Sequence, residues 1–529
     1  MNQRQLDPMR RLLAAAAPAA NARDMDALRG WLAGIGIEDE AKAARLLEVS
    51  YQLSAVSEYR DARTAAILAA SLRPRAAKTR VDLAARLRTF NEGNLLQALV
   101  AGAGAASSMP IPLLLGFAAQ WSYLNRQGAA LALLDEAWRA DPDYPPTIVS
   151  RGQVLTYLGR LDEARQCFER CIQRAPRLAQ AHWFLAHVGK AAPGREHVAR
   201  LRAALQVPGI TADETASFAF ALHKELDDLG DHGGAWEALE QACRAKRGAL
   251  KYDPVESQRL FDALAAWRPP TAAPAVVADD AKAPVFIVGM HRSGTTLLEQ
   301  LLDASPQVRG VGELYDFTSA MRFATDHHCR GVIDGTIVAR AGDIDFDDVG
   351  RRYLEGMAWR LGDEPLFTDK LPSNFLNIGF ICRALPQARI LHMVRDPLET
   401  CFSNLRELFS DANPYSYDQG ELADYFIRYR RLMSHWHALY PGRILDVDYA
   451  ELTRDPEAVM RRVAAFCGIE YVPGMCDPRS STRAVATASA VQVREGVVRR
   501  ETPKWAPYAR QLQPLADALR AGGIKLPAV

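Results

Sequence analysis

The chain has 529 residues, a length that as a loose prior corresponds to about three domains. With 64 Lys and Arg against 63 Asp and Glu, its formal charge of +1 excludes a protein that binds nucleic acid or membranes through its overall field. Hydrophobic residues make up 49% of the chain and charged residues 24%, which excludes a wholly disordered chain, and 8 cysteines are too few for a disulfide scaffold.

The first residues combine a short basic pair with an alanine-rich run. Arg10 and Arg11 precede Leu12, Leu13 and several alanines, a pattern that weakly resembles a signal peptide. Because the apolar part is mostly alanine, we expect the Ala-rich first helix of a cytoplasmic protein. No apolar run approaches the ~20 residues that cross a bilayer as a helix, so we expect no membrane span.

Residues 1–268 are rich in Ala, Leu, Arg and Glu, with apolar residues at helical spacing. This pattern predicts an all-helical region. Within it, the segment from Tyr123 to Pro142 recurs 34 positions later, from Tyr157 to Pro176. A period of 34 residues is the length of a tetratricopeptide repeat.

A third, less regular copy of this pattern begins at Leu229-Gly230-Asp231. Three copies meet the minimum for a stable stack of repeats. Residues before Met109 keep helical spacing without a clean repeat, and we interpret them as degenerate or capping repeats. The region resembles a tetratricopeptide solenoid, a fold whose concave surface favours a protein or peptide partner.

Residues 269–284 are rich in proline and alanine and lack periodicity, which predicts a domain linker. From 285 to 529 the hydrophobic pattern changes to short apolar runs at 285–288, 390–394 and 443–447, separated by helical stretches. Strands that alternate with helices predict a parallel sheet. We therefore expect an all-α solenoid followed by an α/β domain with a P-loop-like parallel sheet and flanking helices.

The first predicted strand leads into a glycine-containing loop, Gly289 to Thr296, and then a helix. The backbone N–H groups of such a loop and the helix N-terminus point at one anion, which predicts a phosphate site. A nucleoside triphosphatase carries Lys where this chain has Thr295. Arg292 supplies the loop's cation instead.

A second phosphate site is indicated by Arg395, which follows the predicted strand 390–394, and by Ser403 in the next helix. An Arg at the end of a strand can bind phosphate through two hydrogen bonds, and a nearby hydroxyl can add another.

The two motifs in this order resemble the sulfotransferases, and most closely the tyrosylprotein sulfotransferases, from about Pro284 to Tyr508. The resemblance implies transfer of a sulfonate group from 3′-phosphoadenosine 5′-phosphosulfate (PAPS) to an acceptor hydroxyl. It implies these catalytic residues: Arg292, Glu313, Lys370 and Ser489. It also implies these donor-binding residues: Arg292, Ser293, Gly294, Thr295, Thr296, Arg395, Ser403, Tyr449 and Lys504.

The chemistry explains these residue types. An acceptor hydroxyl must lose its proton as it attacks sulfur, and the Glu313 carboxylate can take that proton. Charge develops on the sulfonate and on the departing 5′-phosphate, where Arg292, Lys370 and Ser489 would act as fixed donors. We expect no metal, because these side chains can suffice for a sulfonate group.

Two other functions are alternatives. A P-loop kinase or NTPase would use residues 444–448 as its metal-binding strand, but the loop Lys is missing. An inactive repeat scaffold is the third hypothesis, although every polar position of the motif is retained. For the acceptor we expect a protein or peptide tyrosine, with a carbohydrate, lipid or small-molecule hydroxyl as the alternative; Asp316 stands where the tyrosylprotein family has a basic residue.

Two further expectations concern parts outside these motifs. His327 and His328 are adjacent in a polar stretch, and we expect both to be exposed. We also expect a chain that begins in the linker to keep nucleotide binding and to lose recognition of its acceptor, because the solenoid is remote in sequence from the phosphate loop.

Overall fold

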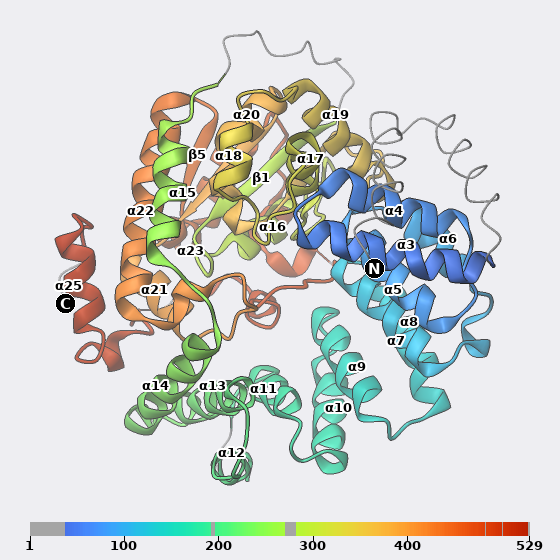
Figure 1. Cartoon of the computed structure of the whole chain (residues 1–529). Coiled ribbons are helices and arrows are strands. Elements are labelled where there is room, and N and C mark those ends of the chain that lie inside the picture. Colours follow the sequence, from blue (N-terminus) through green and yellow to red (C-terminus); the bar gives the residue numbers. More distant parts are fainter. Residues whose placement is uncertain (1–37, 192–195, 270–281, 482, 500, 527–529) are drawn as a thin grey trace. The chain divides into compact units, whose positions relative to one another are not determined.

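The computed structural model describes residues 38–191, 196–269, 282–481, 483–499 and 501–526 (Figure 1). Contacts divide the chain into two compact units, Met1–Pro142 with Tyr315–Arg360, and Asp143–Leu314 with Leu361–Val529. The signal-like start at Arg10 and most of the predicted linker lie outside the described residues. The domain boundaries at 268 and 285 stay a prediction.

The described residues of the first unit are helical, as the amino-acid pattern predicts. Its N-terminal helices are α3 (Asp39–Ala55), α4 (Tyr59–Ser71), α5 (Ala77–Thr89), α6 (Gly93–Ala101), α7 (Ile111–Tyr123) and α8 (Gln127–Ala140). The later segment adds α17 (Asp316–Thr325), α18 (Gly335–Arg340) and α19 (Phe346–Met357). Arg60 joins the two parts by donating to the carbonyls of Phe323, at 2.8 Å, and Ala324, at 2.7 Å.

The 34-residue repeat is visible in the helix boundaries. Helix α7 begins at Ile111, and α9 (Pro145–Tyr157) begins 34 residues later; α8 begins at Gln127, and α10 (Leu161–Arg174) follows it by the same interval. The turns between the paired helices place Asn125 and Gly159 at φ 60° and 78°, a left-handed conformation that Asn and Gly tolerate. The predicted helical repeat region is therefore confirmed.

The second unit continues the helical region before its sheet begins. Its remaining repeat-region helices are α11 (Ala179–His187), α12 (His197–Leu205), α13 (Ala212–Asp228), α14 (His232–Ala249) and α15 (Pro254–Ala266). Trp267 packs edge-on against Phe380, with ring centroids 4.7 Å apart. Arg247 of α14 pairs with Glu421 at 2.7 Å. Helix α14 and the C-terminal end of α15 thus pack directly on the α/β part of the same unit.

The sheet has five parallel strands in the order β2-β3-β1-β4-β5. They are β1 (Ala283–Gly289), β2 (Val308–Arg309), β3 (Leu366–Asp369), β4 (Arg389–Val394) and β5 (Ile444–Asp448). The three predicted strands correspond to β1, β4 and β5, and the α/β parallel sheet is confirmed. The pattern missed β2 and β3, which are too short to show a period.

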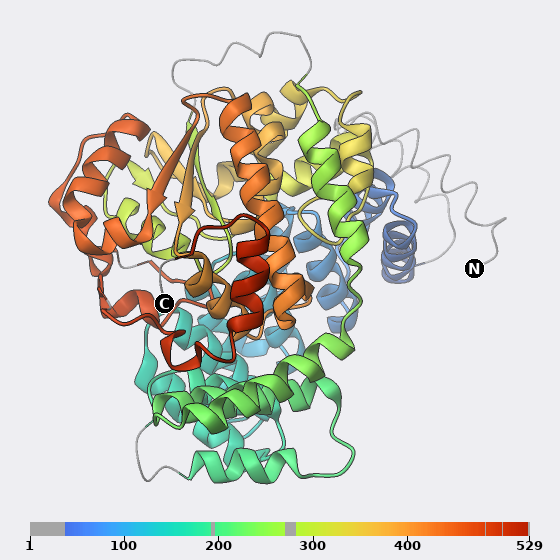
Figure 2. The same cartoon turned by 90° about the vertical axis from the view of Figure 1, so that its left-hand side faces the viewer.

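Helices cover both faces of the sheet. Leu298 and Leu301 of α16 (Thr295–Leu302) and Val463 of α24 (Pro456–Cys467) pack with Ile287 and Leu391 in one buried cluster. The other face meets α22 (Gln419–Leu439), and Figure 2 shows α22 and α24 on opposite sides of the strands. The remaining helices of the domain are α20 (Ile378–Ala384), α21 (Pro397–Leu405), α23 (Tyr449–Arg454) and α25 (Gln513–Ala521).

Among the residues with described positions, none of the helices combines the length and the apolar character needed to cross a bilayer.

Candidate functional site

The loop between β1 and α16 has the geometry of an anion cradle. Gly289 and Gly294 lie at φ 149° and 110°. A Cβ atom on Gly289 would lie 2.8 Å from the Met393 carbonyl oxygen, and one on Gly294 would lie 2.5 Å from the Tyr449 ring. Both positions therefore require glycine, because a side chain would meet neighbouring atoms and strain the backbone.

Three polar side-chain atoms of this loop are buried without a hydrogen bond in the described structure: His291 Nδ1, Arg292 Nε and Ser293 Oγ. Leaving a buried polar group unpaired costs about 1–3 kcal/mol, so three in one loop call for a binding partner. An anion would satisfy Arg292 Nε and Ser293 Oγ, together with the N–H groups at the start of α16. The predicted donor-binding residues Thr295 and Thr296 are buried in the first turn of this helix.

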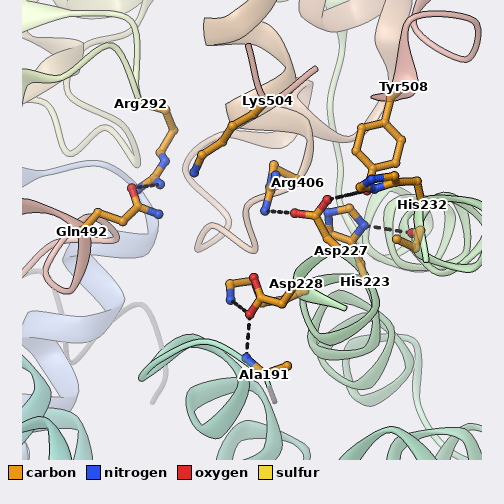
Figure 3. Close-up of polar contacts among 12 residues, drawn as sticks. Ala191, His223, Asp227, Asp228, His232, Arg292, Arg406, Gln492, Lys504 and Tyr508 are labelled. Atoms are coloured by element: carbon orange, nitrogen blue, oxygen red, sulfur yellow. Dashed lines mark hydrogen bonds and ion pairs between the residues drawn. The ribbon is translucent and has the colours of Figure 1, made fainter. Parts of the chain in front are cut away.

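The Arg292 guanidinium connects the loop to the C-terminal segment. Its Nη1 donates to Ser489 Oγ at 2.8 Å, and its Nη2 donates to Gln492 Oε1 at 3.0 Å (Figure 3). The structure therefore brings two residues of the predicted catalytic set together. Gln492, in the short 3-10 turn η7 (Gln492–Glu495), was not predicted.

The other two predicted catalytic residues also meet each other. Lys370 Nζ donates to Glu313 Oε1 at 2.5 Å. Lys370 directly follows β3, and its side chain is fully buried, whereas 36% of the Glu313 side chain is exposed. The carboxylate is thus held by a buried cation and still reaches solvent, which suits a group that exchanges a proton with a substrate.

His291 interacts electrostatically with Lys370 and Arg292, one residue of each pair. Its Nε2 is 3.4 Å from Ser373 Oγ. Burial, assisted by the nearby charges of Lys370 and Arg292, lowers the pKa of His291 to about 4. The ring is therefore neutral at pH 7. No period or spacing in the amino-acid pattern singles out this histidine from the loop around it.

The residues of the predicted second phosphate site surround Arg395, which follows β4. Its guanidinium stacks on the Tyr449 ring, 4.6 Å from the centroid, and donates from Nη1 to the Arg292 carbonyl oxygen at 2.8 Å. Nη2 donates to Glu399 Oε1 at 2.8 Å. Ser403 follows on α21 and is 7% exposed. A guanidinium has five N–H donors, so these two bonds leave others for a ligand.

Lys504 reaches the same region from the C-terminal segment. Its backbone N–H donates to Glu399 Oε2 at 3.0 Å, so Glu399 connects Arg395 to Lys504. Figure 3 shows the Lys504 side chain extending into the space between Arg292 and Arg406. The structure thus places Arg395 and Tyr449 together beside the loop and joins the Lys504 backbone to Arg395 through Glu399, while Ser403 lies buried on α21.

A buried carboxylate among these cations was not predicted. Glu407 Oε2 lies 3.7 Å from Arg292 Nε. Burial raises the pKa of Glu407, and the charges of Arg292, Arg406 and Lys504 oppose that rise. Glu407 follows the last residue of α21, Leu405, by two positions, and only the folded chain shows that it lies beside Arg292.

A cluster of metal-ligand type lies at the sheet edge, where His392, His437 and Asp446 place one ligand atom each within 4.8 Å of one another. His392 Nδ1 and His437 Nε2 both bond to Asp446 Oδ1, at 2.7 Å and 2.8 Å. These hydrogen bonds account for the cluster without an ion. Asp448, on the same strand, accepts from the Glu451 N–H as the cap of α23. Both aspartates therefore form hydrogen bonds within the protein.

The expectation for the histidine pair was wrong. His327 and His328 are half-buried in the first unit. His327 Nε2 lies 2.7 Å from Asp334 Oδ2, and His328 packs against the rings of Tyr59 and Phe90. Local polarity suggested exposure, but the N-terminal helices cover this segment.

The parallel sheet and the glycine loop form an α/β domain with a candidate anion site. Residues 284–473 match the family described as "Sulfotransferase family". The C-terminal domain of this chain is therefore a sulfotransferase-family domain.

The chain is also similar to curated proteins. An uncharacterized protein of Aquifex aeolicus is 29% identical over 412 residues, which cover 76% of this chain and 54% of that protein. A putative protein-tyrosine sulfotransferase of Caenorhabditis briggsae is 26% identical over 191 residues, or 35% of this chain and 66% of that protein. The chain thus spans between about half and two thirds of the length of these relatives.

Two solved structures are each similar to part of the chain. The sulfotransferase domain of the Synechococcus PCC 7002 olefin synthase covers 48% of this chain and 100% of its own, with 20% identity and a TM-score of 0.33. A thermophilic tetratricopeptide protein of Thermus thermophilus covers 34% of this chain and 98% of its own, with 22% identity and a TM-score of 0.25.

Proposed function

We propose that this protein transfers a sulfonate group from PAPS to an acceptor hydroxyl, which we take to be a tyrosine of a protein or peptide. The observation that carries the proposal is the phosphate loop. It has Thr295 where a triphosphate-binding loop has Lys, and it holds the buried Arg292 Nε and Ser293 Oγ, which form no hydrogen bond within the described structure. These groups suit the terminal phosphosulfate of the donor.

The donor supplies an activated sulfonate whose sulfur is attacked by the acceptor oxygen. Glu313 would take the proton of the acceptor hydroxyl as the new S–O bond forms. Lys370, which donates to Glu313, would hold that carboxylate in place. Arg292 and Ser489, already joined at 2.8 Å, would donate to oxygens that gain charge as the bond to the 5′-phosphate breaks.

The proposal is tested by calorimetric titration of the purified chain with 3′-phosphoadenosine 5′-phosphate (PAP) and with ATP, each in the presence of a chelator. We expect PAP to bind without added metal and much more tightly than ATP. Equal binding of the two nucleotides, or a requirement for Mg²⁺, would instead favour the kinase or NTPase alternative.

Replacing Arg395 with Ala is expected to weaken PAP binding by about 1.5–3 kcal/mol, the scale of a charged hydrogen bond. The reason is that Arg395 both faces the predicted 3′-phosphate and holds the Arg292 carbonyl oxygen. Arg389→Ala is the matched control, because Arg389 lies at the other end of β4. The same calorimetric titration measures both variants. Unchanged PAP affinity in Arg395→Ala would remove this residue from the donor site.

A cavity in the repeat region supports a polypeptide acceptor. It measures about 550 Å³ and lies among α10, α11, α12 and α13. Its lining is mostly apolar and includes Ile172, Val207 and Phe218, with Arg177, Arg200 and Glu214 among its charged residues. We propose that an apolar side chain of the acceptor protein enters this cavity.

Filling the cavity tests this part of the proposal. Ala203 lines it and is exposed, so Ala203→Trp should close the space without disturbing the core. The acceptors are proteins from source cells that lack the enzyme, and the assay measures transfer of radiolabelled sulfonate to them. We expect this transfer to fall by about 10-fold or more in Ala203→Trp, the loss of one well-placed anchor. Transfer to a small phenol should stay within about 3-fold of the parent. Only a protein acceptor contacts the cavity remote from its reacting hydroxyl, so only a protein acceptor loses that binding. Equal losses for both acceptors would contradict the assignment.

A further inference from the structure

Asp227 lies at the C-terminal end of helix α13 in the repeat region. It contacts two parts of the transferase domain that are far apart in the chain. Its Oδ2 accepts from Arg406 Nη2 at 2.9 Å, and its Oδ1 accepts from the Tyr508 hydroxyl at 2.6 Å (Figure 3). Burial raises the pKa of Asp227, but Arg406 and the Tyr508 hydrogen bond outweigh burial and lower it. Asp227 is thus ionised and holds both partners.

Those two partners belong to the segments that carry the donor-binding residues. Arg406 caps the C-terminus of α21, one turn after Ser403. Tyr508 lies four residues after Lys504. At the other end of both segments, Glu399 of α21 accepts from Arg395 and from the Lys504 backbone N–H. Asp227 and Glu399 therefore tie the same two segments together at two points.

Packing fixes the Tyr508 end of this arrangement. The Tyr508 ring lies against Phe402 of α21, with centroids 5.1 Å apart, and against Trp236 of α14, with centroids 5.9 Å apart. Tyr508 is completely buried. Because closely packed side chains cannot shift independently, the position of the repeat helices fixes the spacing between α21 and the Lys504 segment.

We propose that Asp227 is a positioning residue through which the repeat region sets the spacing of the groups that bind the donor's 3′-phosphate. This inference rests on the proposed function, since Arg395, Ser403 and Lys504 bind that phosphate only if PAPS is the donor. It assigns the repeats a role in donor binding, separate from any contact with the acceptor.

The test compares PAP with AMP, which lacks the 3′-phosphate, by calorimetric titration of the full chain. In Asp227→Asn we expect PAP affinity to fall about 10-fold, the scale of coupling from a residue outside the site, while AMP affinity changes less than about 3-fold. The preference for PAP over AMP should therefore shrink. A general loss of folding would lower both affinities together and would leave the preference unchanged.

Asp228→Asn is the matched control, because Asp228 is the adjacent carboxylate but bonds to Lys224 and to the Ala191 N–H within the repeat region. We expect it to keep the parental preference. Tyr508→Phe removes the second bond to Asp227 while keeping the ring, and we expect it to reduce the preference in the same direction as Asp227→Asn.

The outcomes distinguish a failure of the proposed function from a failure of the positioning role of Asp227. If the parent chain shows no preference for PAP over AMP, the proposed function fails. If the parent prefers PAP and both Asp227→Asn and Tyr508→Phe keep that preference, the positioning role fails while the proposed function stands. An equal reduction in Asp228→Asn would also overturn it, because that change does not touch the transferase segments.

Discussion

Replacing Glu313 with Gln is expected to lower turnover by about 10²–10⁴-fold, the usual contribution of a general base. Gln keeps the size of the side chain and can still contact Lys370, but its amide cannot accept the acceptor's proton. PAP affinity should change little, because Glu313 is not among the predicted donor ligands. Steady-state rates with a phenolic acceptor and calorimetric titration with PAP measure the two effects.

The structure adds a cost in stability to this variant. Lys370 is fully buried and donates to Glu313, so the substitution leaves a buried ammonium beside a neutral amide. We expect the free energy of unfolding to fall by about 1–3 kcal/mol. Glu364→Gln is the matched control, since the Glu364 carboxylate pairs with Arg309 at 3.2 Å and not with Lys370. Turnover within a few-fold of the parent in a folded Glu313→Gln would make another base necessary, and His291 would be the next residue to replace.

Removing residues 1–268 is expected to leave the transferase domain unfolded. The sequence suggested that a chain beginning in the linker would keep nucleotide binding, but α14 and α15 pack into the second unit. Phe261 stacks on Phe375, and Trp267 packs on Phe380. Losing even one such aromatic residue from a core costs about 3–5 kcal/mol, which is a large part of a domain's total stability.

Circular dichroism and limited proteolysis of the shortened chain measure this outcome. Trp267→Ala in the full chain gives a milder comparison, with an expected loss of about 3–5 kcal/mol in unfolding free energy. Val255→Ala on helix α15, which Trp267 follows, is its control, because Val255 is 52% exposed. A shortened chain that stays folded and binds PAP like the parent would show that the repeats are separable from the domain.

Contiguous motifs were predicted well because their geometry is local. The loop from Gly289 to Thr296 could be identified because a strand, two glycines and a helix must follow one another for the backbone N–H groups to converge. The repeat could be identified because its helices recur at a fixed interval. In both cases neighbouring residues in the chain determine the structure.

The residues that sequence reasoning missed depend on distant neighbours. Glu407 and Gln492 lie 115 and 200 residues after Arg292 in the chain, and nothing in the sequence around them marks them as site residues. Only folding brings them into contact with Arg292. His291 is within the motif, but its neutral state follows from burial beside Lys370. Likewise, contacts between segments far apart in the chain, such as those of Arg60 with Phe323 and Ala324, join residues 315–360 to the first unit.

That discontinuous unit bears on how the chain folds during synthesis. Its N-terminal part ends at Pro142, whereas its last segment ends at Arg360, so the two parts leave the ribosome at different times. At ~5–20 residues per second the interval is on the order of ten to forty seconds. During it, the surface of α4 that later meets α17 has no native partner. Because exposed apolar surface favours aggregation, we expect the nascent chain to depend on chaperones until residue 360 emerges.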